Sequence, residues 1–337
     1  MNILTIDTGT TNTRVTVWTD GRVVGQASRQ VGVRDTAITG NADKLKAGLR
    51  ETITEALDSA DLGKGDIGRV LASGMITSNV GLCEIPHVPA PAGIDDLAAA
   101  MRDSLVDGVW HQPIWFVPGV RNAVEHIGLH NCEAMDMMRG EEVEAFALIE
   151  RLALDEPTVI ALPGSHSKFV SIDRNRRIEG CVTTLAGELL HVISHDTILA
   201  GSLKEGFAKR IDPEMLLAGA ASANRIGLGR ACFSVRILDQ FAVYDANARA
   251  NFLLGAVLGS DLLTLKNSSA IRMNPGTRFI VSGKPILREA IARLVEGDDF
   301  FSGTVTVLGD DEQRDLAGAG AIAVARRRGL VDQDAAA

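Results

Sequence analysis

Two short loops rich in glycine, serine and threonine lie about 155 residues apart, and each separates an apolar stretch from an alternating one. The first is Asp7-Thr8-Gly9-Thr10-Thr11-Asn12 and the second is Pro163-Gly164-Ser165-His166-Ser167-Lys168. Glycine lets the main chain approach a ligand, and successive N–H groups with neighbouring hydroxyls form a concavity suited to anions. One such loop is usually an ordinary hairpin turn. Two, near the starts of the two halves, predict duplicated lobes that hold a polyphosphate between them.

A third group of residues has the spacing of metal ligands. Glu188, His191 and His195 occupy positions i, i+3 and i+7 of a predicted helix. Three such side chains could ligate a metal ion. Metal-binding histidines also need outer hydrogen-bonding partners, and the sequence shows no pattern for them. Ordinary core or surface histidines are therefore the favoured interpretation.

The bulk properties predict an acidic enzyme of about two domains. The chain has 337 residues, of which 46% are apolar and 23% are charged, and its formal net charge is −9. This charge argues against general binding to nucleic acid or anionic membranes, and an aromatic content of 4% weakens a stacking-based nucleic-acid interpretation. Any anionic ligand must be held by local donors.

The cysteines and the apolar runs predict a cytoplasmic protein. Four cysteines are scattered without a Cys-x-x-Cys pair, as expected of reduced thiols. No signal-like apolar region develops before Asp7, and no apolar run approaches the length of a membrane span. The oligomeric state stays open, with a homo-oligomer as one option.

The hydrophobic periodicity predicts alternating strands and helices without a low-complexity linker. The domain boundary should therefore be a hinge within folded structure, near Arg139 and again near Asp315. The predicted strands lie within 2–33 and at 70–72, 113–117, 158–173, 278–281 and 304–308, and the predicted helices lie at 41–60, 94–105, 140–154, 286–295 and 316–328, with a mainly helical stretch over 186–265.

Motifs along most of the chain resemble those of the 2-dehydro-3-deoxygalactonokinases, a family of the acetate and sugar kinase/Hsc70/actin superfamily. The most specific are the Met-Arg-Gly-Glu-Glu run and the Pro-Gly-Ser-His-x-Lys loop, in this order and spacing. From about 198 to 269 only scattered residues match. The matching motifs are Asp7-x-Gly9-x-Thr11-Asn12-x-Arg14, Gly74-Met75-x-x-Ser78-Asn79-x-Gly81, Val117-Pro118-Gly119, Met138-Arg139-Gly140-Glu141-Glu142, Leu162 to Phe169, Thr184-x-x-Gly187-Glu188-Leu189 and Ala317-Gly318-x-Gly320.

The resemblance implies an α/β fold with two duplicated ribonuclease-H-like lobes, as in actin-like ATPases, around an interdomain nucleotide cleft. Residues 1–138 would form the N-terminal lobe with the phosphate-1 loop, joined by a returning C-terminal helix at 316–337. Residues 139–315 would form the C-terminal lobe with the phosphate-2 loop and the adenosine site. The two hairpins should face each other across the largest interdomain cavity.

The resemblance also assigns the ATP-binding residues. Asp7 would hold Mg²⁺ through water, since this ion keeps several of its waters; the alternative is an Asx-turn that caps the loop. Lys168 would neutralise the negative charge of the transferred phosphoryl group; the alternative is a solvated lysine at a strand edge. His166 would either donate to a phosphate or cap its own turn. The remaining phosphate and adenosine contacts would come from Gly9, Thr10, Thr11, Asn12, Gly164, Ser165, Ser167 and Gly283.

For catalysis, the resemblance implies a base at the start of the helix after Gly140. Glu141 is favoured and Asp136 is the alternative; such a carboxylate can accept the proton late in phosphoryl transfer. Acidic residues also suit a helix N-terminus through the helix dipole. Arg139 is the predicted clamp for an acid substrate, unless it pairs with neighbouring glutamates. Further substrate contacts are predicted at Arg14, Asn79 and Glu188.

The implied activity uses ATP and Mg²⁺ to phosphorylate the 6-hydroxyl of 2-dehydro-3-deoxy-D-galactonate, a small sugar acid of galactonate and galactose catabolism. Two alternatives stay open. One is a kinase for another sugar or sugar acid, and the other is an actin-like or Hsp70-like ATP-binding switch. The compact length favours a kinase, because it leaves little room for a peptide-binding or filament module.

Overall fold

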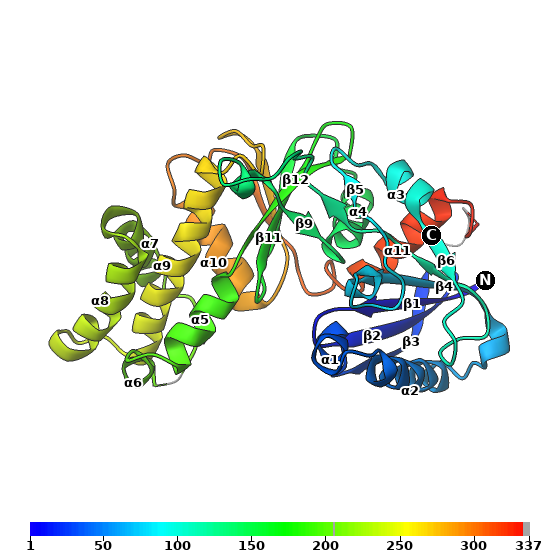
Figure 1. The fold of residues 1–337 in the computed structure, drawn as a ribbon. Coiled ribbons are helices and arrows are strands. Elements are labelled where there is room, and N and C mark those ends of the chain that lie inside the picture. Colours follow the sequence, from blue (N-terminus) through cyan, green and yellow to red (C-terminus); the bar gives the residue numbers. More distant parts are fainter. Residues whose placement is uncertain (205, 333–337) are drawn as a thin grey trace.

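Two α/β lobes lie side by side in the computed structural model, which describes residues 1–204 and 206–332, and both described chain ends belong to the same lobe (Figure 1). The N-terminal lobe is built on a six-stranded sheet in the order β3-β2-β1-β4-β7-β6. Its central strands form because alternating apolar side chains, such as Leu4 and Ile6, are fully buried against helices. The strands are β1 (Asn2–Thr8), β2 (Thr13–Thr19), β3 (Arg22–Arg29), β4 (Ile67–Gly74), β6 (Arg102–Ser104) and β7 (Ile114–Phe116).

The C-terminal lobe repeats this topology in a five-stranded sheet, in the order β12-β11-β10-β13-β14. In each lobe an antiparallel hairpin pairs through its first strand with a later parallel strand, β1 with β4 and β10 with β13. The predicted duplication is therefore confirmed. The strands are β10 (Thr158–Leu162), β11 (Ser167–Ile172), β12 (Ile178–Thr184), β13 (Arg278–Val281) and β14 (Val305–Val307).

Two helices and a small sheet join the lobes. Helices α4 (Glu141–Arg151) and α11 (Leu316–Arg327) pack closely: a Cβ on Gly320 would lie 1.8 Å from the Val143 carbonyl oxygen, so only glycine fits there. Their apolar faces share one core with residues from both sheets. The small sheet contains β5 (Val88–Pro89), β8 (Val120–Arg121) and β9 (Met137–Met138).

The remaining helices cover the two sheets (Figure 1). In the N-terminal lobe, α2 buries Leu45, Leu49 and Ile53, whose near-four spacing puts them on one face. In the C-terminal lobe, α9 is buried over most of its length because α7, α8 and α10 surround it. These helices are α1 (Val33–Thr39), α2 (Asp43–Ser59), α3 (Ile94–Ala100), α5 (Ala186–His195), α6 (Ala200–Leu203), α7 (Pro213–Ile226), α8 (Leu228–Phe241), α9 (Ala246–Asn267) and α10 (Pro285–Glu296).

Three sequence-based boundaries were wrong. The strand predicted to reach Val33 ends at Arg29, because α1 begins at Val33, where Asp35 in its first turn accepts the Gly32 N–H. The helix predicted over 94–105 ends at Ala100, because residues 102–104 pair with the sheet edge. The final helix ends at Arg327, and residues 333–337 of the predicted 316–337 helix lie outside the described part. No helix among the described residues is long and apolar enough to cross a membrane.

Candidate active site

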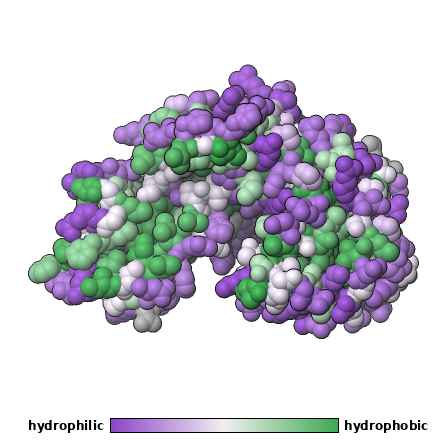
Figure 2. Space-filling model, in the orientation of Figure 1, coloured by the Kyte–Doolittle hydropathy of each residue, from purple (hydrophilic) through white to green (hydrophobic). Residues whose placement is uncertain are grey.

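A pocket of about 770 Å³ lies where the two lobes meet, within the hollow that separates them in Figure 2. It is lined by both lobes and by the connection to α11. Six predicted site residues line it: Arg14, Glu141, Gly164, Ser165, His166 and Gly283. The sequence did not single out several others, including Gln26, Glu144, Lys284, Gln313 and Arg314.

The phosphate-2 loop only partly matches the prediction. Gly164, Ser165 and His166 line the pocket, and His166 Nε2 lies 2.9 Å from Glu188 Oε1. Ser167 instead begins β11 and is 1% exposed, so its hydroxyl points into the lobe. The assignment of Ser167 to the phosphate site is therefore corrected: a ligand in the pocket has no access to its side chain.

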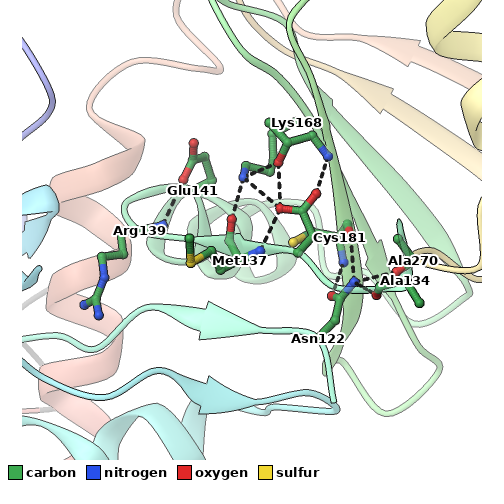
Figure 3. Close-up of polar contacts among 10 residues, drawn as sticks. Asn122, Ala134, Met137, Arg139, Glu141, Lys168, Cys181 and Ala270 are labelled. Atoms are coloured by element: carbon green, nitrogen blue, oxygen red, sulfur yellow. Dashed lines mark hydrogen bonds and ion pairs between the residues drawn. The ribbon is translucent and has the colours of Figure 1, made fainter. Parts of the chain in front are cut away.

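Lys168 also differs from both of its predicted roles. The side chain is buried, and Nζ donates to the Met137 carbonyl at 2.7 Å and to Thr183 Oγ1 at 2.5 Å (Figure 3). Asp136 Oδ1 lies 3.8 Å from the same ammonium. Lys168 is thus neither a solvated strand-edge lysine nor one of the residues that line the pocket. The partners of its charge come from β9, β12 and the residue before β9.

Asp136, the alternative base, belongs to this buried network. Its Oδ2 accepts the Thr183 N–H at 2.5 Å, and its Oδ1 accepts the Thr183 hydroxyl at 2.9 Å and the Met137 N–H at 2.6 Å. Both oxygens are engaged, and the residue does not line the pocket. The structure therefore favours a role for Asp136 in fastening residues 136–138 to β12.

Arg139 fastens the same segment to the other lobe. Its guanidinium donates to the carbonyls of Thr77 and Ile85, each at 2.7 Å, and to Thr77 Oγ1 at 2.7 Å. Burial, together with the Arg139 charge, lowers the pKa of His87 to about 4, so a neutral His87 can accept from Arg139 across 3.4 Å. The side chain points away from Glu141 (Figure 3). This geometry matches neither the predicted substrate clamp nor the predicted pairing with adjacent glutamates.

Replacing Arg139 with lysine should therefore lower stability rather than select against acid substrates. An ammonium cannot reach two carbonyls and a hydroxyl in the planar fork that guanidinium provides, so we expect a loss of about 2 kcal/mol in the free energy of unfolding. Denaturant unfolding measures this loss. The exposed Arg69 provides a matched control for an arginine-to-lysine change. A drop in kcat/KM for the acid with unchanged stability would restore the substrate-clamp hypothesis.

Glu141 is the first residue of α4 and follows the segment that the contacts of Asp136 and Arg139 hold in place. Its Oε2 accepts the Arg139 main-chain N–H at 3.2 Å, while the side chain reaches the pocket. The preceding Gly140 has φ +116°, and a Cβ there would lie 3.5 Å from the Gly74 main chain. This left-handed turn favours glycine and carries the chain from the hinge directly into the helix.

Two further carboxylates accompany Glu141. Burial raises the pKa of Asp7 to about 6, with a further rise from Glu141 and an opposing effect from Arg14. Burial also raises the pKa of Glu144 to about 8, and the charges of Asp7 and Glu141 add to this. In the described residues no hydrogen bond reaches the Asp7 carboxylate, so the Asx-turn alternative is not observed. Glu144 was missed, although it lies three residues after Glu141 on the same helix face.

The tip of the first hairpin lies outside this pocket. Gly9 and Thr10 accept main-chain hydrogen bonds from Val33 and Arg34, which hold the tip against α1. Thr10, Thr11, Asn12 and also Asn79 are exposed and do not line the pocket. Of the two predicted loop tips, the second lines this pocket, through Gly164, Ser165 and His166. The first hairpin contributes Arg14 and, through a small adjoining pocket, Asp7.

A second, more apolar pocket of about 1080 Å³ adjoins the first in the C-terminal lobe. The two share Pro163, Gly164, Ser165, Lys284 and Pro285. The second lies between α5 and the start of α10, and its lining includes Glu188, His191 and His195. No group of three or more histidine, cysteine, aspartate or glutamate side chains placed to hold a metal ion occurs among the residues that the structure describes. Apolar side chains make up much of the remaining lining: Leu190, Val192, Phe207, Ile286 and Leu287.

Two duplicated lobes with a glycine-rich loop and carboxylates at their junction define the fold class of the actin-like ATPases and sugar kinases. A crystal structure of a putative 2-dehydro-3-deoxygalactonokinase from Sinorhizobium meliloti matches 96% of this chain and 98% of its own, with a TM-score of 0.72 at 24% identity. The activator of 2-hydroxyisocaproyl-CoA dehydratase from Clostridium difficile, with bound ADPNP, matches 98% of this chain and 96% of its own, at TM-score 0.51 and 12% identity. These matches confirm the predicted fold.

The family follows from the sequence comparison. The model of the 2-keto-3-deoxy-galactonokinase family matches residues 7–305, and the chain belongs to this family. A probable 2-dehydro-3-deoxygalactonokinase from Rhizobium meliloti (strain 1021) is 27% identical over 136 residues, which is 40% of each chain. The predicted family and enzyme class are thus confirmed.

Proposed function

We propose that the protein transfers the γ-phosphate of ATP to the 6-hydroxyl of 2-dehydro-3-deoxy-D-galactonate, a step in galactonate catabolism. The observation that carries this proposal is the position of Glu141. This carboxylate lines the same pocket as Gly164, Ser165 and Gly283, so a proton acceptor and a phosphate-binding loop share one space between the lobes. Phosphoryl transfer requires mainly such positioning and electrostatic stabilisation.

The nucleotide would lie across the two adjoining pockets. The phosphates would lie along the main chain of Gly164 and Ser165, and the adenine ring would enter the apolar pocket beside α5. The Ser282-Gly283 turn is held in place by Gln313, whose Oε1 accepts from Ser282 Oγ at 2.8 Å and from the Gly283 N–H at 2.7 Å. This turn lines the first pocket directly before Lys284 and Pro285, which line both pockets, and it suits the predicted adenosine contact.

Substitution of Gly283 by alanine should weaken nucleotide binding. Gly283 has φ +106°, and a Cβ would approach Pro163 to 3.0 Å, so the turn must shift. A strained residue of this kind costs about 1–3 kcal/mol. We expect KM for ATP to rise about 10-fold or more, as measured by initial rates. Gly40→Ala is the control, because Gly40 also has positive φ but has open space around it at the end of α1. Equal effects of both variants would contradict a nucleotide role for Gly283.

The carboxylates at the junction suit a magnesium ion. Asp7 and Glu144 have raised pKa values mainly because burial removes them from water, and nearby negative charge adds to the rise. A divalent cation would offset this excess charge. Mg²⁺ is commonly held by one or two carboxylates with waters and phosphate oxygens. We propose Asp7 as the principal contact, with Glu144 beside it; the bound ion would neutralise charge on the transferred phosphoryl group.

The cation nearest these carboxylates is Arg14, and we propose that it binds the acid substrate or the phosphate. It lines both the main pocket and the small pocket that contains Asp7. Within the described residues its guanidinium makes no hydrogen bond or ion pair, so its donors are available to a ligand. A planar guanidinium suits bidentate binding of a carboxylate. With Arg139 committed to main-chain carbonyls, Arg14 becomes the better candidate for the substrate clamp.

In the proposed reaction, Glu141 orients the attacking hydroxyl toward the γ-phosphate. The acceptor oxygen forms a bond to phosphorus as the bond to the β-phosphate bridging oxygen breaks, and the hydroxyl proton passes to Glu141. Because the transition state is loose, this proton can move late in the reaction, once the attacking oxygen has become acidic. ADP and the 6-phosphorylated acid are the products.

A substrate panel tests this function. ADP release in a coupled assay should depend on an added 2-keto-3-deoxy sugar acid and should be negligible with neutral hexoses. ATP hydrolysis at full rate without any sugar would indicate an ATP-binding switch instead. Preference for another sugar or sugar acid would support the kinase activity but replace 2-dehydro-3-deoxy-D-galactonate as the proposed acceptor.

A further inference from the structure

An exposed apolar stripe runs along α8. Phe233, Ile237 and Phe241 are 41%, 38% and 81% exposed, and the following Tyr244 is 44% exposed. The opposite face of the helix, with the buried Val235, packs against α7 and α9. Figure 1 places α8 at the end of the C-terminal lobe farthest from the N-terminal lobe, and Figure 2 shows apolar residues gathered at that end. The stripe belongs to a rigid helix and lies far from the proposed active site.

The order of residues in this stripe is symmetric about Ile237. A phenylalanine lies four residues before it and another lies four residues after it. At 100° per residue, positions 233, 237 and 241 fall within about 80° of the helix circumference, so they form one face. When two copies of such a face pack antiparallel, Phe233 of each copy lies opposite Phe241 of the other. The two copies of Ile237 then meet each other at the two-fold axis.

The charges are complementary in the same arrangement. Arg230 lies on this face, seven residues before Ile237, with its guanidinium 5.7 Å from the centre of the Phe233 ring. In an antiparallel pair it would lie beside the end of the partner's α8, where helix carbonyls give a negative potential. The exposed Tyr244 and Asp245 follow that end. A cation near the start and acceptors near the end suit a second copy of the same helix.

We propose that this protein forms a symmetric homodimer in which α8 of each copy packs antiparallel against α8 of the other. The contact is isologous, so it closes at two copies without exposing a new apolar surface. It leaves the interlobe pocket of each copy accessible, because α8 is remote from it. The proposal does not depend on the proposed activity.

The helix has 14 residues, about 21 Å in length, so one helix from each copy covers less than the ~1,600 Å² of a standard interface. A micromolar dissociation constant is therefore expected. Molar mass measured by light scattering should rise from monomer to dimer between about 1 and 100 μM protein. A monomer throughout this range would overturn the proposal.

Ile237→Glu should abolish the dimer, because two carboxylates would meet at the axis, and should leave kinase activity unchanged. Leu129→Glu is the matched control, since Leu129 is 101% exposed on another segment and its change should leave the dimer intact. A dimer that survives Ile237→Glu would rule out α8 as the interface. Loss of the dimer in both variants would show that added negative charge alone separates the copies.

Cross-linking tests the symmetry directly. In a Cys132→Ser background, which removes an exposed thiol, Ile237→Cys should give a covalent dimer with a short bis-maleimide. Phe233→Cys alone should link at least 10-fold less, because its predicted neighbour is Phe241 of the second copy. Equal yields at the two positions would contradict the antiparallel arrangement.

Discussion

Replacing Glu141 with glutamine should lower kcat by about 10²-fold or more, with little change in KM for either substrate. The amide keeps the shape of the side chain and can still accept the Arg139 main-chain N–H, which Glu141 Oε2 accepts at 3.2 Å. It cannot accept the hydroxyl proton. General-base contributions of this size are typical. Because the lost interaction develops only in the transition state, kcat and kcat/KM should fall together in steady-state kinetics.

Two variants make this test specific. Glu150→Gln changes an exposed glutamate of the same helix and should leave kcat unaffected. Asp136→Asn replaces one of the two oxygens that accept from the Thr183 N–H and hydroxyl by an NH2 donor and removes the charge beside Lys168, so it should mainly lower stability. Near-normal turnover of Glu141→Gln together with a stable but inactive Asp136→Asn would assign the role of catalytic base to Asp136 instead.

The sequence predicted local features well. The hairpins, the glycine turns and the parallel strands depend on neighbouring residues, so their positions follow from periodicity and turn composition. The acidic start of α4 was also recognised. Glu144 was accessible to the same reasoning, because residues three apart share a helix face.

The directions of long side chains could not be predicted in this way. Lys168 turns inward because its acceptors, the Met137 carbonyl and Thr183 Oγ1, come from two other segments. Arg139 turns toward Thr77 and Ile85, more than fifty residues earlier in the chain. Both residues carry charge within a motif, and only the tertiary structure decides whether that charge binds a ligand or is paired within the protein.

These contacts hold the segment before α4 to both lobes. Asp136 and Lys168 tie residues 136–138 to the C-terminal lobe, and Arg139 ties the next residue to the N-terminal lobe. Glu141 follows within one turn. The segment that leads into α4 is therefore held by both lobes directly before the proposed base.

Asp7→Asn should inactivate the enzyme and at the same time stabilise the ligand-free protein. Loss of the carboxylate proposed to bind Mg²⁺ should lower kcat by about 10²-fold or more, since a bound metal would supply several kcal/mol of transition-state stabilisation. The folded-state pKa of Asp7 is raised from 3.8 to about 6, mainly by burial. Its ionisation therefore disfavours folding as pH rises from about 4 to 6, and the cost persists above pH 6 at up to about 3 kcal/mol. Asparagine carries no charge, so it should remove this cost.

Thermal unfolding without nucleotide or metal separates the two effects. At pH 7.5 the variant should unfold at a higher temperature than the wild type, and below pH 4 the difference should vanish because the wild-type carboxyl is then protonated. Addition of Mg²⁺ and ATP should stabilise the wild type far more than the variant, since ligands that bind only the folded state raise its stability. The exposed Asp58→Asn should show neither effect. A variant that keeps its metal-dependent stabilisation would place the ion elsewhere, with Glu144 the next carboxylate to replace.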